Sequence, residues 1–158
     1  MVIGKIYRGQ MNDEGAKDQI LQSLNAGELL MTYLGHGSVE LWRGDLLTSE
    51  EAAGLTNGSR LPLVVAMTCL NGYFHDIYTE SLAEALMKAP NGGAVGVWAS
   101  SGLTEPQGQE EMIDELFRRL FHSSQTVGEA IMKAKASTSD LNVRKTWILF
   151  GDPTLKLR

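Results

Sequence analysis

Apolar and polar positions follow two different spacings along the chain. Continuous apolar runs, which are typical of buried strands, predict strands at residues 27–35, 61–69 and 94–100 and a β-rich stretch at 146–157. The first of these strands is expected to be apolar on both faces. Apolar residues at helical spacing lie between the strands and predict helices at 12–24, 49–55, 79–89, 104–121 and 126–136.

Residues that begin helices support these boundaries. Asn12 precedes the first helix as a typical N-cap residue. Three later helix starts carry the spacing of a capping box, in which a Ser or Thr side chain and a Glu or Gln three residues on bond each other's backbone; the pairs are Ser81 with Glu84, Thr104 with Gln107 and Thr126 with Glu129. Pro106 suits the first turn of its helix.

Strands that alternate with helices predict one α/β domain over residues 1–158. The expected architecture has three layers, α/β/α, around a mostly parallel sheet. No repeat, low-complexity tract or linker divides the chain.

Composition then narrows the classes of function. The net charge is −5, which argues against binding to nucleic acid or to an anionic membrane surface. No apolar run reaches the length of a membrane span, and the first ten residues lack the pattern of a signal peptide. The single cysteine, Cys69, excludes an internal disulfide.

The carboxyl ends of the three predicted parallel strands carry the candidate chemistry, because ligands bind beyond these ends in open parallel sheets. The first strand leads into His36 between two glycines, and the second ends in Cys69. A thiolate can attack a carbonyl carbon while an imidazole protonates the leaving amine. The backbone N–H of Gly37 can approach the developing oxyanion closely, since glycine has no side chain. A buried structural thiol is the alternative for Cys69.

Five blocks in order extend this pattern over nearly the whole chain from about Ile6. They are GHG (35–37), CLNGYF (69–74), SLAEALMKAPNGGAVGVWASSG (81–102), GQEEM (108–112) and FGDPTLKL (150–157). Together they resemble the carboxyl-terminal part of the catalytic domain in the gingipain family of cysteine peptidases, which has a caspase-like fold. The resemblance implies an endopeptidase that cleaves polypeptides through an acyl-enzyme thioester.

The resemblance also implies roles for individual residues. Cys69 would be the nucleophile, His36 the general acid–base, and the N–H groups of Gly37 and Cys69 the oxyanion hole. The pocket for the residue before the scissile bond would have one wall in segment 98–104, with two strand residues opposite; the residues concerned are Trp98, Ser100, Ser101, Gly102, Ala66 and Met67.

Other implications concern what surrounds this part of the domain. The family has further strands upstream and an acidic residue there that orients the histidine, and no position of this chain matches that residue. We expect the open sheet edge to be covered either by the remainder of a longer catalytic domain or by a homodimer. The family binds calcium, but no run here has the spacing of a calcium loop, so we assign no metal ligand and no cofactor. Export from a longer precursor is implied as well.

Two other functions remain open. The chain could be a peptidase-like module that no longer cuts and serves as an interaction scaffold. A flavodoxin-like nucleotide binder is disfavoured, because no glycine-rich phosphate loop opens the first helix. Among residues that could compete for a role, His75 is expected to pack or bond locally to Asp76, His122 to suit a helix end, and Asp152 to form a turn before Pro153.

Overall fold

The computed structural model describes residues 2–157; residues 1 and 158, the two ends of the predicted domain, lie outside this range. Helices and strands alternate as the sequence predicts. In chain order they are α1 (Asp13–Ala26), β1 (Leu30–Leu34), α2 (Ser49–Ala53), β2 (Leu63–Met67), α3 (Leu82–Lys88), β3 (Gly96–Ser100), α4 (Pro106–His122), α5 (Val127–Ser137), α6 (Leu141–Thr146) and β4 (Trp147–Gly151).

The sheet has the order β1-β2-β3-β4. Strands β1, β2 and β3 are parallel, and β4 runs antiparallel to β3. The prediction of a mostly parallel sheet is therefore confirmed. In the register of β1 with β2, Leu34 lies beside Met67, so the two strands end at the same level. This register places the segments after β1 and β2 next to each other.

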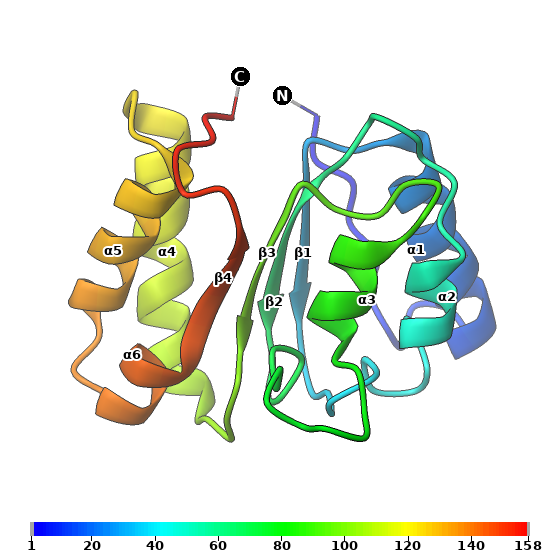
Figure 1. Ribbon diagram of the computed structural model, residues 1–158, viewed down its shortest axis with the longest axis horizontal. Helices are drawn as coiled ribbons and strands as arrows, with labels where there is room; N and C mark the ends of the chain where they lie inside the picture. The colour runs from blue at the N-terminus through cyan, green and yellow to red at the C-terminus, as the bar shows by residue number, and fades with distance from the viewer. Residues whose placement is uncertain (1, 158) are drawn as a thin grey trace.

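Helices cover both faces of the sheet, which confirms the three-layer architecture (Figure 1). Helices α1, α2 and α3 lie on one side, over a core cluster that includes Trp42, Leu55 and Leu86. Helices α4 and α5 lie on the other side, over a cluster that includes Trp98 and Trp147. Burial of these large apolar side chains from water is the main force that holds the layers together.

Most of the predicted helix starts are confirmed. Asn12 caps α1 by accepting a hydrogen bond from the N–H of Gly15, and the capping boxes at Ser81 and Thr126 are present in full. The capping box predicted at Thr104 is wrong. The N-cap of α4 is Glu105, without a side-chain bond, and the hydroxyl of Thr104 instead accepts from Gln109.

Two further expectations need correction. The sequence predicts a first strand that is apolar and buried on both faces, but β1 is only partly buried and Leu34 is 62% exposed. The reason is its place in the sheet, since among residues 2–157 it pairs only with β2. The helix α6 has no counterpart among the predicted elements; Asp140 caps it by accepting from the N–H groups of Asn142 and Val143.

Candidate active site

The register of the sheet brings Cys69 and His36 to the same edge. Leu34 and Met67 are paired at the carboxyl ends of the adjacent parallel strands β1 and β2. His36 lies two residues after Leu34, and Cys69 lies two residues after Met67. The N–H of Gly35 donates to the carbonyl of Met67 at 3.3 Å, so the pairing continues to the residue before His36. His36 is exposed and Cys69 is partly exposed, which leaves both side chains open to a ligand.

The turn that carries His36 is held by its backbone rather than by its imidazole. The carbonyl oxygen of His36 accepts from the N–H of Arg43 and from the hydroxyl of Tyr33, both at 2.8 Å. The Tyr33 ring stacks on Trp42 with 4.2 Å between centroids. Burial raises the pKa of Tyr33, which keeps this hydroxyl protonated as a donor. Within residues 2–157 no side chain bonds the imidazole, so an orienting carboxylate is not found in this range.

The turn that carries Cys69 is tight and strained. The N–H of Asn71 donates to the carbonyl of Cys69 at 2.8 Å, which closes a γ-turn around Leu70. Leu70 has φ of 62°, a left-handed conformation that is uncommon for a residue with a bulky side chain. The N–H of Leu70 bonds Gly102 at 3.2 Å and that of Gly72 bonds Ser100 at 2.8 Å, so the end of β3 holds this turn in place.

Two backbone N–H groups at this edge are unused. Gly37 forms a bridge with Trp42 in which the neighbouring residues make the hydrogen bonds. Among residues 2–157, neither the N–H of Gly37 nor that of Cys69 donates to any protein group. Gly37 also packs tightly against the end of β2, since a Cβ built on it would lie 2.6 Å from the Thr68 hydroxyl. An oxyanion needs free donors of this kind, and the assignment of these two N–H groups to an oxyanion hole stays a prediction.

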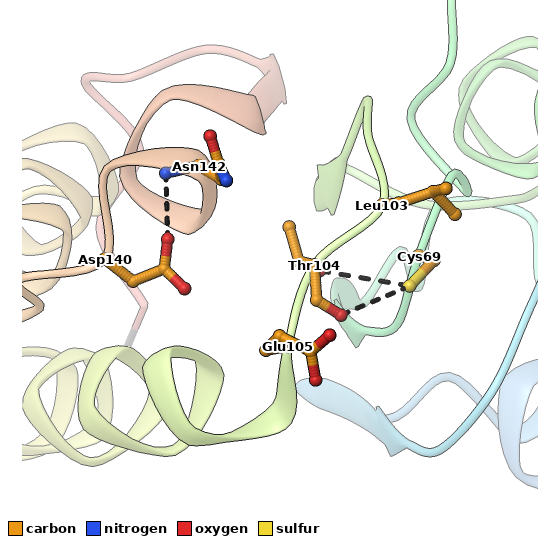
Figure 2. Close-up of a pocket in the computed structure, with 6 residues that line it drawn as sticks. All are labelled: Cys69, Leu103, Thr104, Glu105, Asp140 and Asn142. Carbon is orange, nitrogen blue, oxygen red and sulfur yellow. Dashed lines mark hydrogen bonds between the residues drawn. The ribbon is translucent and has the colours of Figure 1, made fainter.

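A pocket of about 370 Å³ opens beside the thiol (Figure 2). The residues that line it are Cys69, Leu103, Thr104, Glu105, Asp140 and Asn142. The thiol of Cys69 donates to the carbonyl of Thr104 at 3.5 Å. Figure 2 shows that Glu105 reaches the pocket from the start of α4 and that Asp140 reaches it from the start of α6. The pocket is therefore acidic, and its two carboxylates come from separate elements.

The structure corrects part of the predicted pocket wall. Trp98, Ala66 and Met67 are at most 2% exposed, and their side chains belong to the core. Trp98 packs against Trp147 with 6.3 Å between ring centroids. The prediction that these three side chains line the pocket is wrong, because the register of β2 and β3 turns them into the helical layers.

Ser100, Ser101 and Gly102 lie next to the pocket but are occupied by internal bonds. The hydroxyl of Ser100 donates to the hydroxyl of Thr146 at 3.0 Å, and the hydroxyl of Ser101 donates to the Thr146 carbonyl at 3.0 Å. Gly102 leaves no room for a side chain, since a Cβ would lie 2.7 Å from Thr146. These residues join β3 to α6 and to the Cys69 turn, and a direct role in binding substrate stays a prediction.

The remaining candidates have structural surroundings. His75 packs against Tyr73 at 4.0 Å between ring centroids, and Asp76 accepts from the N–H of Tyr78 instead of from His75. Asp152 accepts from the N–H and hydroxyl of Thr154, and these hydrogen bonds lower its pKa, as suits a turn.

Neither a metal centre nor a membrane-spanning helix is present in residues 2–157. No three His, Cys, Asp or Glu side chains gather there as a metal site would need. None of the described helices combines the length and the apolar character that crossing a bilayer demands.

Four residues at this site are not among those that the sequence pointed to; they are Glu105, Asp140, Asn142 and Asn71. Nothing in the chain marks Glu105, Asp140 or Asn142 as pocket residues, since the packing of α6 against the start of α4 brings the last two to the pocket. Asn71 lies inside the CLNGYF block, but its side-chain contacts with the His36 turn cannot be read from its position in the chain. The one available signal was its place two residues after the thiol.

Comparison with known proteins shows which family has this fold and sequence pattern. The chain is 31% identical over 154 residues to gingipain R2 and to gingipain R1 of Porphyromonas gingivalis. Each alignment covers 88% of this chain. The chain spans 21% of the length of gingipain R2 and 15% of the length of gingipain R1. A solved structure of the Arg-specific cysteine proteinase gingipain R superposes with a TM-score of 0.76 at 29% identity, covering 90% of this chain and 36% of that one. The predicted caspase-like fold of the gingipain type is thereby confirmed.

The match also extends along the sequence. The family model for peptidase family C25 covers residues 2–158, which includes both edges of the sheet and every residue of the pocket. Because this match spans nearly the whole chain, the chain belongs to peptidase family C25.

Proposed function

We propose that the protein is a cysteine endopeptidase that uses Cys69 and His36. The Cys69 thiolate attacks the carbonyl carbon of the scissile peptide bond, and the tetrahedral intermediate collapses to a thioester as the C–N bond breaks. His36 protonates the leaving amine. Water, deprotonated by the same imidazole, then attacks the thioester, and the thiol and the new carboxyl product are released.

The observation that carries this proposal is the shared register of the two residues with free donors beside them. Cys69 and His36 lie just beyond adjacent parallel strands at the same level, and the N–H groups of Gly37 and Cys69 have no partner within residues 2–157. An oxyanion formed at the attacked carbonyl would accept from both groups. Donors that are already in place stabilise a transition state without reorganisation.

The pocket supports a proposal for the substrate. Glu105 and Asp140 would attract a basic side chain at the residue before the scissile bond. A gingipain R with a solved structure is described as Arg-specific, and a preference for a basic side chain, Arg or Lys, is proposed here on the acidity of the pocket. Export from the cell is proposed on the same relationship.

The test is irreversible labelling of Cys69 by a peptidyl acyloxymethyl ketone that ends in Arg. We expect labelling far faster than that of free cysteine, and a loss of about 10²- to 10⁴-fold in His36→Ala, the range that general acid–base catalysis contributes. His75→Ala is the matched control, since it removes another exposed histidine, six residues after the thiol in the chain, and should leave the rate unchanged.

A different outcome would favour the second function. Within residues 2–157 no carboxylate orients the imidazole of His36, which favours this second function, a peptidase-like module that does not cut. If Cys69 reacts no faster than free cysteine and no peptide is cleaved, the protein acts as a peptidase-like interaction module instead.

A further inference from the structure

One buried side chain fastens the turn that carries Cys69 to the turn that carries His36. Asn71 is 1% exposed, and its Nδ2 donates to the carbonyl of Ser38 at 2.6 Å and to that of Leu41 at 3.3 Å. Its backbone N–H closes the γ-turn by bonding Cys69. Asn71 therefore contacts both turns directly. It lies two residues after Cys69, and its partner Ser38 lies two residues after His36.

The carbonyls that Asn71 bonds belong to the segment that sets the position of Gly37. Ser38 and Leu41 are also joined by the bond from the Ser38 N–H to the Leu41 carbonyl at 2.9 Å. Gly37 precedes Ser38 and lies against Thr68 without spare room. If Asn71 released these two carbonyls, Gly37 would be free to shift relative to Cys69, and its N–H would shift with it.

The hydrogen bonds of Asn71 also hold the strained backbone at Leu70 in place. A left-handed residue between Cys69 and Asn71 persists only where its surroundings fix it. Asn71 is fixed on both sides, because its carbonyl accepts from the N–H of Ala83 at the start of α3 while its amide holds the His36 turn. A shift at either side would let the turn relax and move the sulfur.

We propose that Asn71 is a positioning residue, which sets the placement of the Cys69 thiol relative to His36 and to the N–H of Gly37. This inference rests on the proposed function. Only the donor half of the amide is used, since the Oδ1 of Asn71 is buried and has no partner within residues 2–157. An amide kept for packing alone would not need its nitrogen directed at two carbonyl oxygens.

The test exploits a second buried asparagine that joins two segments elsewhere. Asn57 is 2% exposed, and its Nδ2 donates to the carbonyls of Arg60 and Gly93, both at 2.9 Å. Asn71→Asp and Asn57→Asp each replace a donor to two carbonyls by an acceptor of the same shape. Both variants should lower the melting temperature, so stability alone does not separate them.

The two variants are distinguished by the rate at which the Arg-containing peptidyl ketone inactivates each of them, measured over a range of inhibitor concentrations. For Asn71→Asp we expect the maximal inactivation rate to fall about 10- to 100-fold, the scale of a misplacement near 1 Å. The inhibitor concentration at half-maximal rate should stay unchanged, because Asn71 does not line the pocket. For Asn57→Asp both constants should match the unaltered protein.

Each outcome decides the question. If both variants lose stability and the maximal rate of Asn71→Asp stays within about twofold, Asn71 is structural only and the inference is wrong. If Asn71→Asp does not fold, Asn71→Ser retains one donor and should show a smaller fall in the same constant. Failure of the proposed function looks different, because the unaltered protein itself would then react no faster than free cysteine.

Discussion

A buried asparagine lies at each end of the parallel strands, and the hydrogen bonds of the two asparagines differ. The amino-terminal ends of β1, β2 and β3 form the amino edge of the sheet, and their carboxyl-terminal ends form the carboxyl edge. At the amino edge, before β2 and β3, the Oδ1 of Asn57 accepts from the N–H of Gly93 at 2.8 Å, in addition to the two bonds its Nδ2 donates. At the carboxyl edge, among residues 2–157, the Oδ1 of Asn71 and the hydroxyl of Thr68 are buried without a partner. The side-chain amide of Asn57 is therefore fully satisfied, whereas that of Asn71 is not.

This difference indicates where the folded state is less stable than it could be. A buried polar atom without a partner lowers the stability of the folded state, and such atoms are few in native proteins. Here two of them lie beside a strained Leu70 and beside the unused N–H groups of Gly37 and Cys69. The other four such atoms in residues 2–157 belong to Trp42, Trp98, Trp147 and Gln125. What supports a catalytic role for the edge where the thiol and imidazole emerge is therefore the coincidence of two unpartnered atoms with a strained residue and unused N–H groups.

The largest expected effect comes from one of a pair of matched glycine substitutions, one at each end of the parallel strands. In Gly37→Ala the new Cβ would lie 2.6 Å from the Thr68 hydroxyl and 2.9 Å from the Leu41 carbonyl, which forces the Gly37 N–H to move. We expect labelling of Cys69 by the peptidyl ketone to slow by about 100-fold or more, as when an oxyanion-hole donor is lost.

Gly92→Ala is the matched control at the other edge. Its Cβ would collide with the side chain of Asn57 and would lie 2.8 Å from the Asn57 nitrogen, so stability should fall there too. The labelling rate of the folded fraction should not change. Equal slowing in both variants would mean that packing, and not the position of one donor, controls reactivity.

Removing charge from the pocket should have a smaller effect. Glu105→Gln and Asp140→Asn keep the shape of the pocket, and asparagine still caps α6 as aspartate does. Each should lower kcat/KM for a peptide with Arg before the scissile bond by a few-fold, since partly exposed ion pairs contribute about 0.2–1 kcal/mol.

The comparison substrate carries Gln in place of Arg. The two variants should leave its kcat/KM unchanged, because no ion pair is lost with a neutral side chain. A parallel loss for both peptides would show that the two carboxylates do not select a basic residue.

The features that could be predicted well from the sequence are those decided within a few residues or by strand order. Ser81 and Glu84 form their capping box within one helical turn. The placement of Cys69 and His36 at one edge came from consecutive strands being adjacent and parallel. Local spacing and a common topological rule were enough for both.

The features that escaped prediction depend on contacts between distant segments. Trp98 looked available for a pocket wall, but pairing with β4 brings Trp147 against it and buries it. Asp140 enters the pocket because α6 packs against the start of α4, and α6 is too short to give a helical pattern. Thr104 has the spacing of a capping residue, yet its hydroxyl accepts from Gln109 instead.

The smallest expected effect concerns the start of α3, which contacts Asn71 through the N–H of Ala83. Burial alone would raise the pKa of Glu84, but hydrogen bonds from Ser81 and the charge of Lys88 outweigh it, so the pKa lies below 4.5. The folded state therefore binds this proton more weakly than the unfolded state. Its contribution to stability is complete above about pH 4.5 and is lost as the pH falls through the lowered value.

Glu84→Gln measures that contribution. It should lower the free energy of unfolding by about 0.5–1 kcal/mol at pH 7 and by less near pH 3, as chemical denaturation at the two pH values can show. Labelling of Cys69 at pH 7 should stay within twofold of the unaltered protein. A difference in stability that grows on acidification would contradict the assigned direction of the pKa.

Trapping of the acyl-enzyme intermediate would show whether Cys69 performs acyl transfer at the carboxyl edge. The protein is mixed with an Arg-containing peptide ester, quenched in acid within milliseconds to seconds, digested and analysed by mass spectrometry. We expect the mass of the acyl group on the peptide that contains Cys69, and its absence in Cys69→Ser. An unmodified Cys69 during active turnover, or acylation of another residue, would contradict the account.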